Sequence, residues 1–135
     1  MTLPRDSGAQ FARFLHHRRQ YSIPSGMARP DAFLPPKSKD ETSVVEITRL
    51  PDESVWDMAR YTLNAASGRA CVLGRADFAA AASTSLGLVC ARDDDGFCGH
   101  GTLSHWPTEP ERRRQVALEL CRLAKLKLAE SPITC

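Results

Sequence analysis

The sequence predicts a single domain of the α+β class, or a small α/β domain, with three to four short strands and about three helices. The chain has 135 residues, the length of one domain, and can bury a core without metal or disulfide cross-links. Hydrophobic residues make up 42% and charged residues 25%, as is typical of globular proteins. From residue 41 onward, short apolar or β-branched runs alternate with helical patterns. We therefore expect a compact domain at residues 41–135 behind an extended N-terminal arm at residues 1–40.

The predicted arm is rich in proline, arginine and serine. A proline inside a helix removes a backbone hydrogen bond, so the prolines exclude one long helix through the arm. They are Pro4, Pro24, Pro30, Pro35 and Pro36. Residues 10–21 are expected to form a short helix or strand, and Phe33 and Leu34 are expected to anchor the arm on the core.

Strands and helices are expected to alternate between residues 43 and 106. The β-branched run at 43–48 favours a strand. Apolar residues at helical spacing favour a helix at 52–64, with a stripe at Val55, Met58, Ala59 and Leu63 flanked by Trp56. The remaining expected elements are a short strand at 70–73, a helix at 79–85 capped by Asp77, a buried strand at 86–91 and a strand at 101–106.

The last helix has the clearest start signal. Thr108 is followed three residues later by Glu111, the order of a capping box, and Pro110 suits the first turn. The apolar face consists of Val116, Ala117, Leu120, Cys121, Leu123, Ala124 and Leu128. We therefore expect this helix to continue to Leu128, with Lys125 and Lys127 near the negative end of its dipole.

The charge is unevenly distributed along the chain. The net charge is +2, but residues 1–40 hold seven basic and three acidic residues, a balance of +4 that leaves −2 for the remainder. The positive charge therefore lies on the predicted arm, through which a protein or nucleic-acid partner is expected to bind.

The cysteines and the N-terminus predict a cytoplasmic protein. Five cysteines is an odd number, and the N-terminus lacks the apolar stretch of a signal peptide, so reduced thiols are expected. Cys71 and Cys90 lie in apolar runs and are expected to be buried, and Cys135 is expected to be exposed. No apolar run reaches the length of a membrane span, so no membrane partner is expected.

The segment 93–106 is the best candidate for a catalytic loop, because many polar residues follow a strand expected to be buried. His100 and His105 are predicted to exchange protons in phosphodiester cleavage without metal. Arg75, or alternatively Arg92, would neutralise the phosphate. The chain would then be a small metal-independent ribonuclease or phosphodiesterase; the alternative is that these histidines only cap turns.

A zinc-stabilised structural module is the second alternative. Cys98, His100 and His105, together with Cys90, supply the soft ligands that zinc prefers. Their spacing matches no standard zinc motif, so the main expectation is that the chain holds no cofactor.

The leading prediction is a small binding or accessory module that acts with a protein or nucleic-acid partner. Arg13, Arg18 and Arg19 are predicted to contact phosphates. The aromatic residues interleaved with them, Phe11, Phe14 and Tyr21, would stack on bases. A further segment, Gly74–Asp77, is expected to turn from a strand into a helix, with Asp77 as the cap or the backbone amides as an anion site.

Several short motifs resemble those of a family of small uncharacterised bacterial proteins with no established activity. The matching motifs are Ala32–Pro35, Thr42–Ile47 with Trp56, Gly74–Asp77, Leu86–Val89, and His100 followed by Trp106–Pro107. The resemblance covers about three quarters of the chain and implies no mechanism. It singles out Arg75, Asp77, His100 and Trp106 as matching positions, and the chain departs from the pattern at Cys98 and His105.

Overall fold

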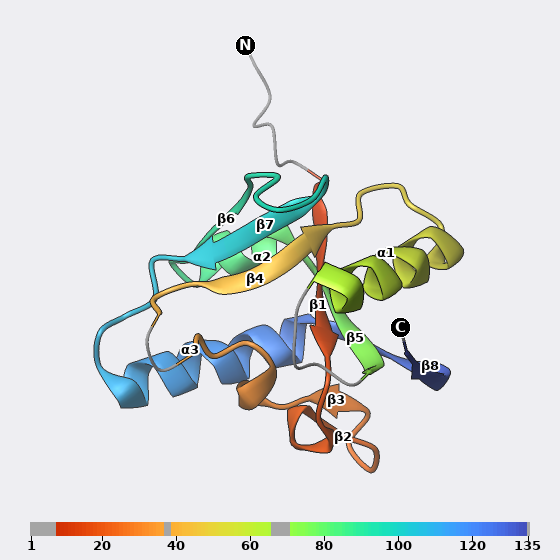
Figure 1. Cartoon of the computed structure of the whole chain (residues 1–135). Coiled ribbons are helices and arrows are strands. Elements are labelled where there is room, and N and C mark those ends of the chain that lie inside the picture. The colour runs from red at the N-terminus through yellow and green to blue at the C-terminus, as the bar shows by residue number, and fades with distance from the viewer. Residues whose placement is uncertain (1–7, 37–38, 66–70, 135) are drawn as a thin grey trace.

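The fold is a single α+β domain built on one antiparallel sheet. The computed structural model describes residues 8–36, 39–65 and 71–134. Six strands pair in the order β6-β7-β4-β1-β5-β8, which is more strands than the sequence predicted (Figure 1). They are β1 (Gln10–Leu15), β4 (Thr42–Glu46), β5 (Val72–Ala79), β6 (Val89–Arg92), β7 (His100–Ser104) and β8 (Lys125–Ile133).

Three α-helices and two short 3-10 helices complete the domain. The α-helices are α1 (Asp52–Ala65), α2 (Ala80–Ser85) and α3 (Pro110–Leu123). The 3-10 helices η1 (Arg18–Gln20) and η2 (Pro30–Ala32) flank a separate hairpin of β2 (Tyr21–Ser22) and β3 (Met27–Ala28). Among the described residues, no helix has the length and apolar character needed to cross a membrane.

Strand β1 lies inside the sheet, although its residues were expected to belong to an arm. It pairs with β4 on one side and β5 on the other. Ala12, Leu15 and the predicted anchor Phe33 are completely buried, and the half-buried Leu34 packs against the larger core cluster. β1 therefore forms part of the core, because a central strand has both faces covered by neighbouring elements.

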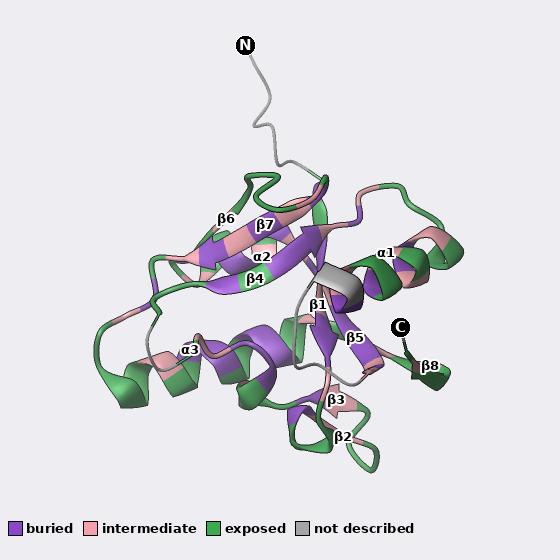
Figure 2. Cartoon of the chain, in the orientation of Figure 1, coloured by how far each residue is buried: buried purple, intermediate pink, exposed green. Residues whose placement is uncertain are grey.

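Two clusters of buried side chains cover the two faces of the sheet. Figure 2 colours the buried positions along the strands and helices that contribute to them. The larger cluster joins the sheet to α2, α3 and η2, with Phe11 stacked on Phe78 and Phe33 edge-on to the same ring. The smaller cluster joins the other face to α1 through Val55, Ala59 and other apolar residues. The predicted strand at 43–48, helices at 52–64 and 79–85, and strand at 101–106 are confirmed, with bounds that differ by at most two residues.

The prediction of a turn and helix cap at Gly74–Asp77 is wrong. These residues lie in the middle of β5, which continues to Ala79 because β1 and β8 hydrogen-bond to its two sides. Glycine at position 74 allows β8 to approach β5 closely, since a Cβ atom there would lie 2.8 Å from the Lys127 carbonyl oxygen. The short strand was expected to begin at residue 70, which lies outside the described residues.

The prediction that the last helix continues to Leu128 is also wrong. Helix α3 ends at Leu123, and β8 follows it along the edge of β5. The free edge of β5 offers backbone partners to these residues, and this tertiary pairing overrides their helical spacing. Leu128 is consequently 42% exposed. The expected capping box does not form, because Glu109 occupies the N-cap without a side-chain hydrogen bond.

The strand expected to be buried at 86–91 is an exposed edge strand. It begins at Val89, and only Leu88, just before it, is buried. Among the described residues, β6 has one neighbouring strand, β7, and no strand pairs with its other edge. Cys71 and Cys90, expected to be buried, are only partly so, whereas Cys121 is buried; Cys135 lies outside the described residues.

A buried arginine ties α1 to the sheet. Arg75 is only 1% exposed, and its Nε donates to the two carboxylate oxygens of Asp77 at 3.0 and 3.2 Å. Its Nη2 donates to Asp52 at the start of α1, and its guanidinium carbon lies 4.7 Å from the centre of the Trp56 ring. Lys127 Nζ also donates to Asp52 Oδ1, at 3.0 Å. Because α1, β5 and β8 all supply charges, this ion network fixes their relative positions.

The two carboxyl groups of the network respond differently to it. Burial raises the pKa of Asp77, although the hydrogen bond from Arg75 opposes this shift. The hydrogen bonds from Lys127 and Arg75 lower the pKa of Asp52, which is exposed to solvent. Among the described residues, only the Nη1 group of Arg75 is a buried side-chain polar atom without a hydrogen-bond partner.

We expect Arg75→Met to destabilise the protein by about 3 kcal/mol, because it leaves the half-buried Asp77 carboxylate without its main cationic partner. Urea denaturation would measure the change in the free energy of unfolding. Arg60→Ala is the matched control. Arg60 and Asp57 form an exposed ion pair within α1, so loss of this pair should change the free energy of unfolding little. Equal stabilities of Arg75→Met and the wild type would contradict the role given to the network.

Candidate cavity between β1 and β4

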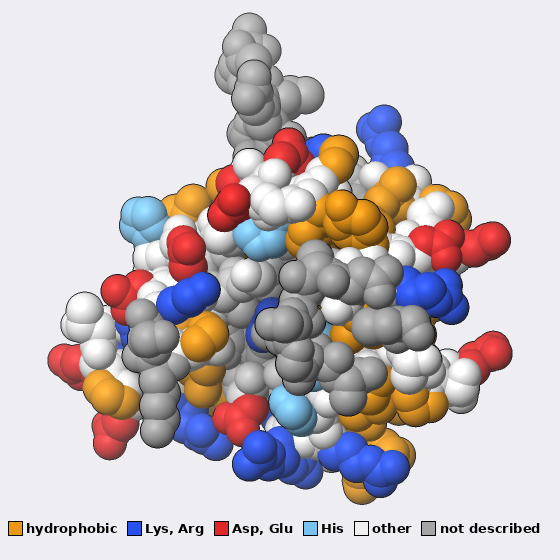
Figure 3. Space-filling model, viewed as in Figure 1, with side chains coloured by type: hydrophobic (Ala, Val, Ile, Leu, Met, Phe, Trp, Pro, Cys, Tyr) orange, Lys and Arg blue, Asp and Glu red, His pale blue; other side chains and the backbone are white. Residues whose placement is uncertain are grey.

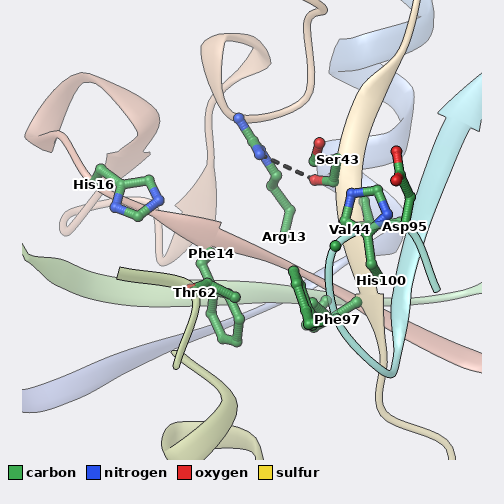
Figure 4. A pocket seen from close by; sticks show the side chains of 12 residues that line it. Arg13, Phe14, His16, Ser43, Val44, Thr62, Asp95, Phe97 and His100 are labelled. Atoms are coloured by element: carbon green, nitrogen blue, oxygen red, sulfur yellow. Dashed lines mark hydrogen bonds between the residues drawn. The ribbon is translucent and has the colours of Figure 1, made fainter. Parts of the chain in front are cut away.

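A cavity opens where β1 and β4 separate. The two strands form only two residue pairs, Phe11 with Glu46 and Ala12 with Val45. β1 nevertheless continues to Leu15, and β4 begins at Thr42. The gap has a volume of about 280 Å³. Its lining comes from β1, β4, α1, β7 and the loop before β7 (Figure 4).

Arg13 bridges the separated strands at this cavity. Its Nη1 donates to the Ser43 carbonyl oxygen at 3.0 Å (Figure 4). Its Nε donates to the Ala32 carbonyl oxygen at 2.9 Å. These two bonds fix the plane of the guanidinium group. The sequence predicted Arg13 as a binding residue, and the structure places it in the lining of the cavity.

His100 enters the cavity from β7 and is oriented by an aspartate. Its Nδ1 lies 2.6 Å from Asp93 Oδ1, and the edge of the Phe97 ring packs against the imidazole with 5.4 Å between ring centres. No hydrogen bond joins its Nε2 to any other described residue. A histidine held through Nδ1 in this way presents Nε2 in a fixed direction.

The Asp93 carboxylate is itself held by its own loop. It accepts a hydrogen bond from the Asp95 backbone N–H at 2.9 Å. Partial burial raises the pKa of Asp93, but the bonds from Asp95 and His100 lower it by more, so its pKa lies below the ordinary 3.8. Asp93 therefore stays ionised at neutral pH, and its Oδ1 accepts a hydrogen bond from the Nδ1–H of His100.

His16 lies at the opposite end of the cavity from His100 in the view of Figure 4, with Arg13 between them. The His16 Nδ1 lies 2.8 Å from the Cys71 carbonyl oxygen. His16, Thr62 and Phe97 also line the cavity and were not predicted as site residues. The alternation of side chains along a strand would have found His16, since it places residues 12, 14 and 16 on one face. That signal was missed because these residues were assigned to an arm.

The structure does not bring His105 and Arg75 to His100. His105 follows β7 at its far end, five residues on, which is roughly 16 Å at the rise of a strand. Its Nδ1 lies 3.2 Å from Ser104 Oγ, and it does not line the cavity. Arg75 is occupied in the buried network below α1. The three predicted catalytic residues therefore lie in three separate places.

The cysteine and histidines expected in the zinc hypothesis do not assemble either. Within residues 8–36, 39–65 and 71–134, no three His, Cys, Asp or Glu residues are grouped to hold a metal ion. Cys98 Sγ instead lies 3.0 Å from the Arg92 Nη2, which donates to it. Arg92 also pairs with Asp94 and Glu46, and these hydrogen bonds raise its pKa.

The remaining predicted binding residues have distinct environments. Arg18 and Arg19 are exposed on η1, two and three residues after His16. Basic side chains also gather along the lower margin of the surface in Figure 3, where Figure 1 places the β2–β3 hairpin. Trp106 is buried, and its Nε1 donates to the Leu103 carbonyl oxygen at 3.0 Å.

The aromatic residues of the predicted arm do not form an exposed stacking surface. Phe11 and Phe14 are both buried, and Tyr21 is half-buried against the larger core cluster. Of the three, only Phe14 lines the cavity. A base could therefore meet Phe14 only inside the cavity, where Phe97 also contributes an aromatic ring.

We expect the bond between Asp93 and His100 to make stability depend on pH in the acid range. The folded-state pKa of Asp93 is lowered, so its contribution is fully present above 3.8 and is lost as the pH falls through the folded value. The difference in unfolding free energy between wild type and Asp93→Asn should shrink from about pH 5 to about pH 2 in urea titrations. A difference independent of pH would contradict the assignment.

Comparisons of the chain with known protein families, curated proteins and solved structures find no match. The resemblance of its motifs to a family of small bacterial proteins therefore stays a prediction. The contacts around the cavity are the observations from which a function is inferred.

Proposed function

We propose that the protein is a binding module for single-stranded nucleic acid, and that the cavity between β1 and β4 takes one nucleotide. The observation that carries this proposal is the guanidinium group of Arg13, fixed at a cavity that also presents two aromatic rings. Arginine suits phosphate because its planar donors match the phosphate oxygens. Aromatic rings suit bases because every base has a stacking face.

The size and polarity of the cavity favour one nucleotide unit. Its volume of about 280 Å³ lies near the lower end of small-molecule sites, which span roughly 300–1,000 Å³. Arg13 and His16 contribute basic groups, whereas Asp95 contributes an acidic group beside His100. A phosphate fits the basic groups, and the exocyclic amine of a base fits the acidic group as a hydrogen-bond donor.

The exposed arginines next to the cavity extend the site along a strand of nucleic acid. His17, Arg18 and Arg19 follow His16 in the chain, and the side chains of these three residues are exposed. The arginine side chains would contact the phosphates next to the bound nucleotide. The sequence left the choice between a protein and a nucleic-acid partner open; this combination of arginines and aromatic rings favours nucleic acid.

We expect the protein to bind a labelled single-stranded oligonucleotide, with an affinity that falls as salt rises. The double variant Arg18→Ala/Arg19→Ala should bind at least about ten-fold more weakly, and the slope of log affinity against log salt should decrease by about 1.4, or 0.7 for each lost phosphate contact. Fluorescence anisotropy measures both quantities.

Arg112→Ala/Arg114→Ala is the matched control for this experiment. Both arginines are exposed on α3, which contributes no residue to the cavity. An equal loss of affinity in the two double variants would show attraction to net charge alone, and absence of binding by the wild type would refute the proposal.

A second variant tests the cavity itself. Thr62→Phe places a bulky ring from α1 into the cavity and should weaken oligonucleotide binding about ten-fold or more at unchanged salt slope, since no phosphate contact is lost. Thr84→Phe is the control, because Thr84 makes the same type of side-chain bond to a carbonyl within α2 and does not line the cavity. Unchanged binding by Thr62→Phe would remove the cavity from the site.

A further inference from the structure

We propose that the cavity also cleaves RNA, with His100 as the general base that takes the proton from a ribose 2′-hydroxyl. This activity rests on the proposed function, because the nucleotide must first occupy the cavity. It differs from the pair of histidines that the sequence suggested, since His105 lies at the other end of β7.

The geometry of His100 meets the requirement for a general base. A base needs a nitrogen that is open to the substrate and a partner that stabilises the ring after it accepts a proton. Asp93, at 2.6 Å from Nδ1, is that partner. The imidazole is 13% exposed and lines the cavity, so Nε2 is the atom that meets a bound ligand.

The surroundings of His100 indicate where the nucleophile comes from. Ser104 Oγ is engaged with His105 and the Val89 carbonyl oxygen, and Cys98 Sγ accepts from Arg92. Among the described residues, no hydroxyl or thiol is hydrogen-bonded to His100. The Asp93–His100 pair thus lacks the protein nucleophile of a catalytic triad, so the nucleophile must belong to the substrate or be water.

RNA supplies its own nucleophile at the correct position. His100 Nε2 accepts the proton of the 2′-hydroxyl, and the 2′-oxygen forms a bond to the adjacent phosphorus. The bond between phosphorus and the 5′-oxygen of the next nucleotide breaks, and that oxygen takes a proton from water. The products are a 2′,3′-cyclic phosphate and a free 5′-hydroxyl, and the proton on His100 returns to solvent. Atoms and charge balance without an oxidant or a further reactant.

Arg13 has a defined part in this step. Negative charge builds on the phosphate oxygens as the 2′-oxygen attacks, and a positioned guanidinium group stabilises that charge. Arg13 is held on two carbonyl oxygens and needs little reorganisation to do so. Asp93 is a positioning residue, because it acts through His100.

The test compares an RNA oligonucleotide with the DNA oligonucleotide of the same sequence. We expect the wild type to bind both and to cleave only the RNA, leaving a 2′,3′-cyclic phosphate that mass spectrometry identifies. His100→Ala and His100→Gln, purified in the same way, should lose at least about 100-fold in rate. Asp93→Asn should lose at least ten-fold in rate with unchanged affinity, and His105→Ala should cleave like the wild type.

Each other outcome overturns a defined part of the proposal. RNA that is bound but stays intact refutes the activity and leaves the binding module standing. Cleavage of the DNA as well shows that water is the nucleophile and refutes the 2′-hydroxyl step. Equal cleavage by wild type and both folded His100 variants, checked by circular dichroism, assigns the activity to a contaminant. Failure to bind either oligonucleotide refutes both the proposed function and this inference.

Discussion

The short ladder between β1 and β4 is the constraint on which the rest of the structure depends. β1 forms six residue pairs with β5 but only two with β4, so the sheet is continuous on one side of β1 and open on the other. Backbone groups along the opening need partners, because buried polar groups without hydrogen bonds destabilise a fold. Arg13 provides one by donating to the Ser43 carbonyl oxygen. One side chain therefore both completes the fold and lines the cavity.

Arg13 and Arg75 show how the same residue type acquires different roles on neighbouring strands. Arg75 stands opposite Phe14 in the β1–β5 ladder, and α1 covers it with Asp52 and Trp56. Its charge is satisfied by carboxylates, so it acts as a structural tie. Arg13 instead meets the neutral carbonyls of Ser43 and Ala32 at an open cavity. The carbonyls fix the position of the guanidinium group, which favours recognition of a ligand there.

Local patterns predicted the elements whose partners are near in sequence, and missed those whose partners are distant. The helix at 52–64 was predictable because its apolar stripe is complete within its own residues. β1 and β8 were not, because both acquire their conformation from pairing with β5, which lies about 60 and 50 residues away in the chain. Arg13 and His100 were both selected by residue type. Arg13 and His100 line the same cavity because β1, β4 and β7 are neighbours in the sheet, and no local sequence pattern predicts that order.

The position of the cavity in the fold determines how the binding of a ligand there would affect stability. The cavity exists only when β1 is inserted between β4 and β5, so a ligand that occupies it binds the folded state alone and must stabilise it. The Arg13 guanidinium and the His100 imidazole are already held by Ser43 and Asp93 before any ligand arrives. Little side-chain entropy is then lost on binding, so the free energy of contact with a phosphate or a base contributes more fully to affinity. The hydrogen bonds that stabilise the opening in the sheet therefore also preorganise the site that the opening creates.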